Sequence, residues 1–369
     1  MFKFNELKTV HLEISTRCQA SCPMCPRNWH GEMENPHLQI ADWTYDEFVQ
    51  VFDQQTLDQI ITIYFCGNFG DPIMNDDLIK MCQYIKDHSP SMDVRIHTNG
   101  GARSKSWWQS LYQALPANHV VIFALDGLED THSLYRIGTK YEHVIRNAQY
   151  FIKEGGVAEW VFIKFKHNEH QAEEAEHRSK QLGFQRFTVK NTTRFVGEDK
   201  FAVYDKQGNT QYYLEPPSDN KVTFITPEQI RNFKKVLEAS DIQCYVQNNR
   251  EIYIDAHKKV FPCCFLASAP YNYRLETIPY DENNTLSVVR NIKNQQLQQY
   301  YDLVETLGGI ENLSALNRPI KDIIDDTVWQ TAWDQYWNEK KLITCARVCG
   351  KMIDNFSKPI DQFVKRVSN

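Results

Sequence analysis

Residues 18–25 read Cys18-Gln19-Ala20-Ser21-Cys22-Pro23-Met24-Cys25, with three residues between the first two cysteines and two between the last two. The stretch follows the short apolar run 10–14, and together they predict a strand that ends in a tight loop. Such a loop can turn three thiolates toward one point. The number is informative, because a [4Fe–4S] cluster used only for electron transfer normally takes four cysteines, one for each iron. Three cysteines leave one iron open to another molecule.

Other interpretations of these three cysteines are structural thiols, a disulfide with one thiol left over, or part of a zinc site. Structural zinc usually takes four ligands, commonly as two close pairs. No partner pair lies near this stretch in the sequence. We therefore favour the iron–sulfur interpretation.

Length and composition describe an ordinary globular protein of 369 residues, 42% of them hydrophobic and 24% charged. The length suits one barrel-sized domain and a smaller one. The net charge of −6 argues against a nucleic-acid partner. No apolar run reaches the about 18 residues of a membrane span, and the N-terminus lacks the pattern of a signal peptide. Ten cysteines without an export signal favour metal ligation in a reducing compartment, so we expect a cytoplasmic protein.

The first two hundred residues alternate short β-branched or aromatic runs with longer segments of helical period. The predicted strands are 10–14, 61–65, 94–97, 120–124, 160–164 and 186–189. The predicted helices are 45–52, 77–87, 105–114, 141–154 and 171–182. This alternation predicts an α/β fold with a parallel sheet and right-handed crossovers.

Polar, glycine-containing stretches follow three of these strands. They are Cys66-Gly67-Asn68-Phe69-Gly70-Asp71-Pro72, His97-Thr98-Asn99-Gly100-Gly101 and Ala124-Leu125-Asp126-Gly127. Barrels of parallel strands carry their chemistry at these strand ends. The glycines of the first stretch would let its backbone approach a ligand closely, and a plain turn is the alternative.

A second group of cysteines lies in the C-terminal third. Cys244 precedes a predicted hairpin with strands 251–255 and 260–265, whose second strand contains Cys263 and Cys264. Cys345 and Cys349 follow about eighty residues later. Structural zinc is one interpretation, although the eighteen residues between Cys244 and Cys263 suit zinc ribbons poorly.

The C-x3-C-x2-C pattern at the end of a first strand resembles the cluster loop of radical S-adenosylmethionine (SAM) enzymes. The resemblance implies a partial (β/α)6, TIM-like barrel and a [4Fe–4S] cluster held by Cys18, Cys22 and Cys25. In that family the open iron binds the amino and carboxylate groups of SAM. One electron from the cluster cleaves SAM, and the resulting 5′-deoxyadenosyl radical removes a hydrogen atom from the substrate.

The same resemblance suggests residues that contact SAM. Residues 66–72 look like the family's Gly-Gly-Glu-Pro motif, although Asp71 replaces the glutamate and Phe69 separates the glycines. Arg136 stands where relatives often carry an arginine that could pair with the SAM carboxylate, and a solvated surface arginine is the alternative. Met24 takes a position that is usually aromatic and packs on adenine. The SAM-binding residues expected from the resemblance are Met24, Gly67, Gly70, Asp71, Pro72, Asn99, Asp126 and Arg136.

The family's serine contact to SAM is not carried over, because Ala124 stands where relatives have that serine. Lys164 and Lys190 end the fifth and sixth predicted strands and are candidates for catalytic residues that face the substrate. Each could equally be a solvated charge at a strand end.

The second cysteine group is similar to the auxiliary-cluster module of radical SAM proteins, called twitch when it carries one cluster and SPASM when it carries two. The resemblance implies a small C-terminal α+β domain and a second [4Fe–4S] cluster. Its expected ligands are Cys244, Cys263, Cys345 and Cys349. Cys263 is preferred to Cys264 because it directly follows a proline. The expected division is a barrel over 1–200, a connector with a linking helix over 201–243, the cluster domain over 244–351 and a terminal helix over 352–369.

The resemblance therefore predicts a radical SAM oxidoreductase that acts on a small polar metabolite or a peptide and receives electrons from a flavodoxin- or ferredoxin-type reductant. A non-catalytic iron–sulfur carrier or a zinc-stabilised binding protein is the alternative, and RNA modification is less favoured by the charge. Four aromatic residues, Trp329, Trp333, Tyr336 and Trp337, recur on one helix face. We expect them to pack in the core or to line the substrate entrance.

Overall fold

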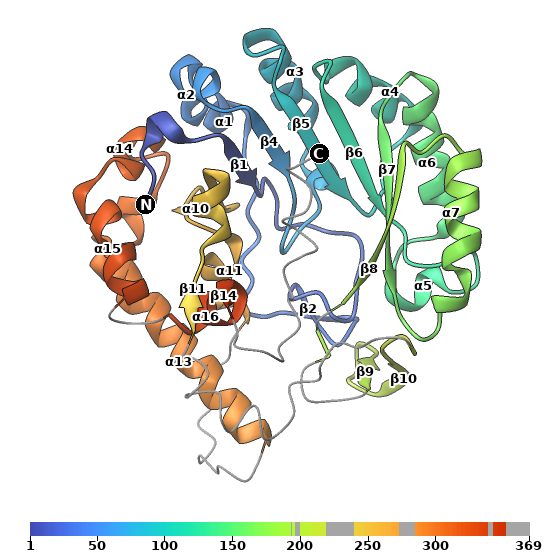
Figure 1. Ribbon diagram of the computed structural model, residues 1–369. Coiled ribbons are helices and arrows are strands. Elements are labelled where there is room, and N and C mark those ends of the chain that lie inside the picture. Colours follow the sequence, from blue (N-terminus) through green and yellow to red (C-terminus); the bar gives the residue numbers. More distant parts are fainter. Residues whose placement is uncertain (193, 196–199, 219–239, 273–284, 339–341, 352–369) are drawn as a thin grey trace.

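An eight-stranded sheet organises the chain (Figure 1), whose computed structural model describes residues 1–192, 194–195, 200–218, 240–272, 285–338 and 342–351. Six consecutive strands of the sheet are mutually parallel. They are β1 (Thr9–Leu12), β4 (Thr62–Phe65), β5 (Asp93–Thr98), β6 (His119–Ala124), β7 (Ala158–Lys164) and β8 (Arg186–Asn191). The predicted α/β partial barrel is thus confirmed.

Helices between these strands cover the outer face of the sheet (Figure 1). They are α1 (Tyr45–Val51), α2 (Gln54–Gln59), α3 (Leu78–His88), α4 (Lys105–Ala114), α5 (His132–Tyr135), α6 (Tyr141–Lys153) and α7 (Ala172–Gln181), with short 3-10 turns η1 (Phe4–Glu6), η2 (Pro72–Met74) and η3 (Glu169–Gln171). Local sequence fixes several of their starts: Thr44 and Glu47 form a capping box on α1, and Ser104 caps α4.

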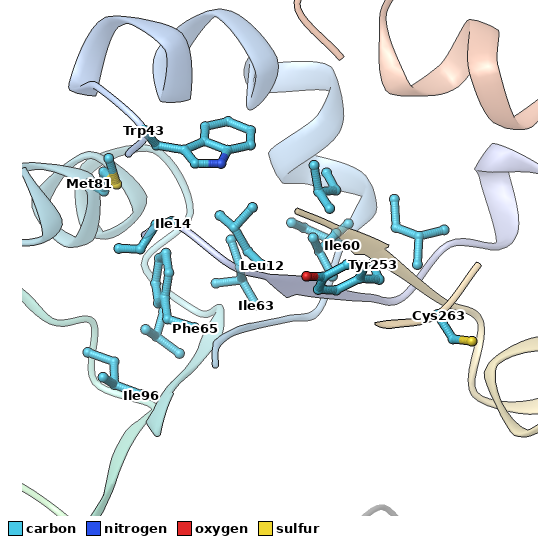
Figure 2. Close-up of a cluster of buried hydrophobic side chains, with 14 of the residues drawn as sticks. Leu12, Ile14, Trp43, Ile60, Ile63, Phe65, Met81, Ile96, Tyr253 and Cys263 are labelled. Atoms are coloured by element: carbon cyan, nitrogen blue, oxygen red, sulfur yellow. The ribbon is translucent and has the colours of Figure 1, made fainter. Parts of the chain in front are cut away.

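The two faces of the sheet differ in polarity. In β5, Val94 and Ile96 are fully buried in the core beneath the helices, whereas Arg95 and His97 point to the opposite, inner face and are half-buried. Figure 2 shows the core side, where Leu12, Ile14, Phe65 and Ile96 gather below Trp43 and Met81. In β5 the period-two alternation therefore gives an apolar outer side and a polar inner side, whereas Val120, Ile122 and Val161 of β6 and β7 form a separate apolar cluster.

The C-terminal hairpin extends the barrel sheet at its β1 edge. β12 (Glu251–Ile254) pairs in parallel with β1, and β13 (Val260–Phe261) pairs antiparallel with β12. The predicted hairpin is present, but its second strand ends at Phe261 rather than at residue 265. Pro262 cannot donate to the strand ladder, and α11 (Cys264–Ala267) begins directly afterwards.

Further helices complete the C-terminal part. They are α10 (Tyr245–Asn249), α12 (Ala269–Asn272), α13 (Thr285–Thr306), η4 (Ile310–Leu313), α14 (Ile320–Ile324), α15 (Thr327–Asn338) and α16 (Ile343–Cys349). Short strands β11 (Asp241–Ile242) and β14 (Gly350–Lys351) pair with each other. Residues from this part and from the barrel belong to one hydrophobic core cluster. The two parts that were predicted as separate domains thus share one hydrophobic core.

Two small ribbons lie near the ends of the barrel strands (Figure 1). β9 (Phe201–Tyr204) and β10 (Thr210–Leu214) form a hairpin, and β2 (Asn28–Trp29) pairs with β3 (Met33–Glu34). The terminal helix expected over 352–369 lies outside the described residues, as do residues 219–239 of the connector that was expected to contain a linking helix. Among the described helices, not one is both long and apolar enough to span a membrane.

Candidate functional site

The first three cysteines lie on the loop that leaves the C-terminal end of β1. Cys22 is buried, and Cys18 and Cys25 are half-buried; all three are free thiols. The backbone N–H of Cys25 donates to the Cys22 carbonyl at 3.0 Å, which folds this end of the loop into a turn. The loop packs into a small apolar cluster that includes Met24 and Phe165. The structure therefore holds the three thiols in one compact, largely dry loop.

Several N–H groups point at these sulfur atoms. The Ala20 backbone and the Asn99 side chain donate to Cys18 Sγ at 3.4 and 3.5 Å. The Arg136 guanidinium donates to Cys22 Sγ at 3.7 Å. Burial raises the pKa of Cys22 to about 11, and the charge of Arg136 opposes that rise. Donors placed in this way favour sulfur atoms that carry negative charge, as metal-bound thiolates do.

The loop after β4 lies directly against the cysteine loop. A Cβ atom on Gly70 would stand 2.0 Å from the Ser15 carbonyl oxygen, and one on Gly67 would stand 1.9 Å from the Gly70 carbonyl oxygen. Only glycine fits at these two positions. The Asn68 carbonyl lies 4.0 Å from Cys25 Sγ. The structure thus brings Gly67 and Gly70 beside the three cysteines.

Asp71 joins the loops that follow β4 and β5. One carboxylate oxygen accepts hydrogen bonds from the Thr98 hydroxyl at 2.8 Å and from the Ile73 backbone, and the other accepts from the Asn99 backbone at 2.7 Å. Burial raises the pKa of Asp71, and these hydrogen bonds oppose the rise. Pro72 begins η2 directly afterwards. Because Asn99 also donates to Cys18, Asp71 indirectly fixes the position of that thiol.

Arg136 and Asp126 form a buried ion pair with a separation of 2.6 Å between Arg136 Nε and Asp126 Oδ2. The Asp126 side chain is completely buried, and its other oxygen accepts from the Ile163 backbone. Only 16% of the Arg136 side chain is exposed, so the alternative of a solvated surface arginine is wrong. Its guanidinium instead links Asp126 to Cys22.

The remaining predicted residues lie around the same strand ends. Met24 is buried, and its carbonyl accepts a hydrogen bond from Arg194 at 2.5 Å. Lys164 and Lys190 are half-buried at the ends of β7 and β8. Burial raises the pKa of Asp126, and the charges of Arg136 and, least of all, Lys190 oppose this rise.

The second cysteine group surrounds a separate cavity. Cys244 precedes α10, Cys263 precedes α11, and Cys345 and Cys349 belong to α16. All four line a small cavity of about 10 Å³, together with mainly apolar and aromatic side chains. Cys244 and Cys349 share a hydrogen bond, which raises the pKa of the first thiol and lowers that of the second.

Cys264 is not among the residues that line this cavity. Burial raises its pKa, and the nearby Cys263, Glu251 and Cys66 groups raise it further. Glu251 and Cys66 belong to β12 and to the loop after β4, so Cys264 lies toward the barrel. The adjacent thiols of Cys263 and Cys264 thus lie in two different environments, the first at the cavity and the second toward the barrel.

Within the described ranges, no three His, Cys, Asp or Glu side chains are placed to hold a single metal ion. The four thiols of the second group all line one cavity. In a four-iron cluster each cysteine binds a different iron, so its four ligands do not have to meet at one ion.

Sequence reasoning missed a polar network on the inner face beside the first site. Glu13 Oε1 accepts from the backbone N–H groups of Phe69 and Gly70 at 2.7 and 3.2 Å, and its other oxygen accepts from the Tyr253 hydroxyl at 2.5 Å. Burial raises the pKa of Glu13 to about 7. The signal in the sequence was the pair of polar residues at alternate positions of the first predicted strand, His11 and Glu13, which places both on the same face of that strand.

A second carboxyl–tyrosine pair lies on the same face. The Tyr64 hydroxyl donates to Glu251 at 2.6 Å, and burial raises the pKa of Glu251 to about 7. The His11 ring stacks on Tyr64 at 4.4 Å, and burial lowers its pKa to about 4. Because Glu251 and Tyr253 belong to β12, this network joins the two halves of the chain.

Comparison with known proteins gives one curated relative and several solved structures. The sequence matches no model of a known protein family. It is 25% identical over 134 residues to the "tungsten-containing aldehyde ferredoxin oxidoreductase cofactor-modifying protein" of Pyrococcus furiosus. That match covers 36% of this chain and 34% of the relative, about a third of each.

Similar solved structures cover more of the chain at low identity. SuiB of Streptococcus suis, bound to S-adenosylmethionine, is 14% identical with a TM-score of 0.46 over 77% of this chain and 65% of SuiB. Native anSMEcpe with bound AdoMet is 15% identical with a TM-score of 0.46 over 92% of this chain and 99% of that protein. BtrN in complex with AdoMet and 2-DOIA is 12% identical with a TM-score of 0.44 over 96% and 95%. SuiB, anSMEcpe and BtrN are radical SAM enzymes.

Proposed function

We propose that the protein is a radical SAM oxidoreductase that holds a [4Fe–4S] cluster through Cys18, Cys22 and Cys25. The observation that carries this proposal is the convergence of three strand-end loops on those thiols. The loops after β4, β5 and β6 contribute the glycine backbone, the Asp71–Asn99 pair and Asp126, and Arg136 follows the last of them. Each of these elements was expected from the sequence to contact the cluster or SAM.

The protein side chains would position the cofactors and exclude water from them. Asn99 and Arg136 donate to the Cys18 and Cys22 sulfurs, and Asp71 and Asp126 hold those two donors in place. Gly67 and Gly70 let this loop pack tightly against backbone, including that of Ser15, and the carbonyl groups of the loop would accept hydrogen bonds from the amino group of SAM. When bound, the cluster would supply the electron that cleaves SAM.

The second cysteine group supports the oxidoreductase assignment. Cys244, Cys263, Cys345 and Cys349 would hold an auxiliary [4Fe–4S] cluster with all four irons bound by protein. Such a cluster suits the acceptance or relay of the electron that an oxidised substrate loses. The cavity between the four thiols and its apolar lining support this proposal.

The inner face of the barrel supports a small polar metabolite as substrate, with a peptide as the alternative. Tyr64, His97 and Lys190 are half-buried polar side chains on or beside this face. Lys190 and Lys164 are proposed to face the substrate from the ends of β8 and β7. The external electron donor would be a flavodoxin- or ferredoxin-type protein.

The test is anaerobic reconstitution of the full chain and of a Cys18/Cys22/Cys25→Ala variant, with iron, sulfide and zinc analysis. We expect about eight irons in the first protein and about four in the second. With SAM and a reductant, the first protein should produce 5′-deoxyadenosine and the variant should not. Iron without deoxyadenosine in the full chain would favour a non-catalytic iron–sulfur carrier, and zinc in the C-terminal site would favour a binding protein.

A further inference from the structure

Three tryptophans of α15 carry buried indole nitrogens that lack a hydrogen-bond partner in the described part of the protein: Trp329, Trp333 and Trp337. They are spaced four residues apart and therefore share one helix face. Trp329 is 2% exposed and Trp333 is 0% exposed. A buried N–H group without an acceptor destabilises a fold, so such groups call for a specific explanation.

Two of the three indoles line the cavity of the second cysteine group. Trp333 and Trp337 are lining residues of that cavity, and Trp329 is not. The Trp337 indole lies within interaction distance of the Cys345 thiol in this cavity. No hydrogen bond of normal geometry joins the two groups. The indoles and the thiols thus face the same space.

The cavity offers these indoles few acceptors other than sulfur. Most of its remaining lining consists of apolar and aromatic side chains. Two lining residues, Tyr245 and Thr344, carry hydroxyl groups, and the Thr344 hydroxyl already accepts a hydrogen bond from Gln296 at 2.9 Å. A group that fills the space between the four thiols would place sulfur atoms in front of the indoles.

We propose that Trp333 and Trp337 donate indole N–H hydrogen bonds to sulfur atoms of the iron–sulfur group held by the four cysteines and thereby raise its reduction potential. The inference rests on the proposed function of this cysteine group. One-electron reduction adds negative charge to the group, and hydrogen bonds to its sulfurs stabilise the more negative state. A raised potential suits an electron acceptor.

The test is an EPR-monitored redox titration of the auxiliary cluster in the Cys18/Cys22/Cys25→Ala background, where no other cluster contributes a signal. Trp337→Phe and Trp333→Phe each remove one N–H donor and keep an aromatic ring. We expect each change to lower the equilibrium constant for reduction about tenfold, which makes the one-electron midpoint potential about 59 mV more negative. Trp329→Phe is the matched control and should leave the potential unchanged.

Iron content shows whether a negative result contradicts the role of the tryptophans or the presence of the auxiliary cluster itself. Full iron loading with an unchanged potential in both Trp333→Phe and Trp337→Phe would overturn the tryptophan assignment alone. An equal shift in Trp329→Phe would overturn it too, because the effect would then not depend on the cavity. Absence of iron from the background protein would overturn the auxiliary cluster and the inference with it. If Trp333→Phe fails to fold, the half-buried Trp337 still provides the test.

Discussion

At the scale of single residues, Glu13 is a carboxyl group in an unusually buried setting. Its side chain is 1% exposed, and its two oxygens accept two backbone N–H groups and one tyrosine hydroxyl. Burial nevertheless raises its pKa from 4.5 to about 7. Glu13 therefore holds the loop of Phe69 and Gly70 in place, although burial disfavours the charged form of its carboxyl group.

This raised pKa predicts how stability changes with pH. Between pH 4.5 and about 7 the folded protein binds more protons at Glu13 than the unfolded chain does, so the free energy of unfolding falls as the pH rises through this interval. Glu13→Gln removes this dependence. From pH 5 to pH 8 the wild type should lose about 2 to 3 kcal/mol relative to the variant.

Thermal unfolding of both proteins at a series of pH values checks this expectation. Glu251 and Asp255, whose pKa values burial raises to about 7 and about 6, are present in both proteins, so their contributions largely cancel. A difference in melting temperature that is constant from pH 5 to pH 8 would contradict the assignment.

The two adjacent cysteines, Cys263 and Cys264, should respond differently to substitution. Cys263 lines the cavity of the second group and Cys264 does not. In the Cys18/Cys22/Cys25→Ala background, Cys263→Ser should lose most of the about four irons of a four-cysteine cluster, whereas Cys264→Ser should retain them. Iron and sulfide analysis distinguishes the two. Loss of iron from Cys264→Ser with retention in Cys263→Ser would reverse the assignment.

The amino-acid sequence predicts the roles of some site residues better than those of others. The spacing of Cys18, Cys22 and Cys25 is local, and the sequence was sufficient to place these cysteines on one loop. The partners of Glu13 are not local, because Tyr253 lies 240 positions away. A contact of this kind depends on strand order, which periodicity alone does not specify.

At the scale of elements, the loop between β4 and η2 depends on the absence of side chains at its glycines. An alanine Cβ at position 70 would meet the Ser15 backbone at 2.0 Å, and backbone cannot move aside as a flexible side chain can. Gly70→Ala should therefore cost about 1 to 3 kcal/mol of stability. We expect it also to weaken SAM binding, because the loop is displaced from the cysteines.

Melting temperature and equilibrium SAM binding to the reconstituted protein measure the two effects. Gly309→Ala is the control: its φ of +91° strains an alanine, but no atom lies within 4 Å of the added Cβ. It should lower stability and leave SAM affinity unchanged. Wild-type affinity in Gly70→Ala would show that the loop does not position SAM.

The sequence predicted the strands of the barrel because each strand is marked by its own short run of β-branched or aromatic residues. Runs of four or five residues between helical segments identified the six parallel strands of the barrel, within a few residues at each end. The hairpin boundary was less accurate, because the apolar run continued past Pro262 although the proline ends the ladder. The apolar composition there favoured a longer strand, but Pro262 lacks the backbone N–H that would continue the ladder, so the strand ends.

At the scale of the whole molecule, the C-terminal part extends the barrel sheet and shares its core. β12 supplies the neighbour on the free side of β1. The Trp43 indole donates to the Asp255 carbonyl at 3.0 Å, and the Phe4 backbone N–H donates to Asp325 at 2.9 Å. The division at residue 200 expected from the sequence therefore does not mark an independent boundary in the hydrophobic core, which residues of both parts share.

This shared core predicts that residues 1–218 do not fold alone, although they contain every strand of the predicted barrel. Without β12, the parallel strand β1 becomes an exposed apolar edge, which promotes association between chains. The Trp43 indole loses its acceptor, and the core loses the side chains that β12 and α15 contribute. We expect the fragment to aggregate or to lack a cooperative thermal transition, as measured by size-exclusion chromatography and near-UV circular dichroism.

Co-expression with residues 240–369 provides the control, because it restores β12 and its contacts without a covalent connection. The pair should co-purify and regain a cooperative transition, since the hydrogen bonds from Trp43 and Phe4 join residues on opposite sides of the cut. A soluble, monomeric 1–218 fragment that unfolds cooperatively would instead show that the barrel is an independent domain. The network through Glu13 and Tyr253 would then be an interface between two domains rather than part of one folding unit.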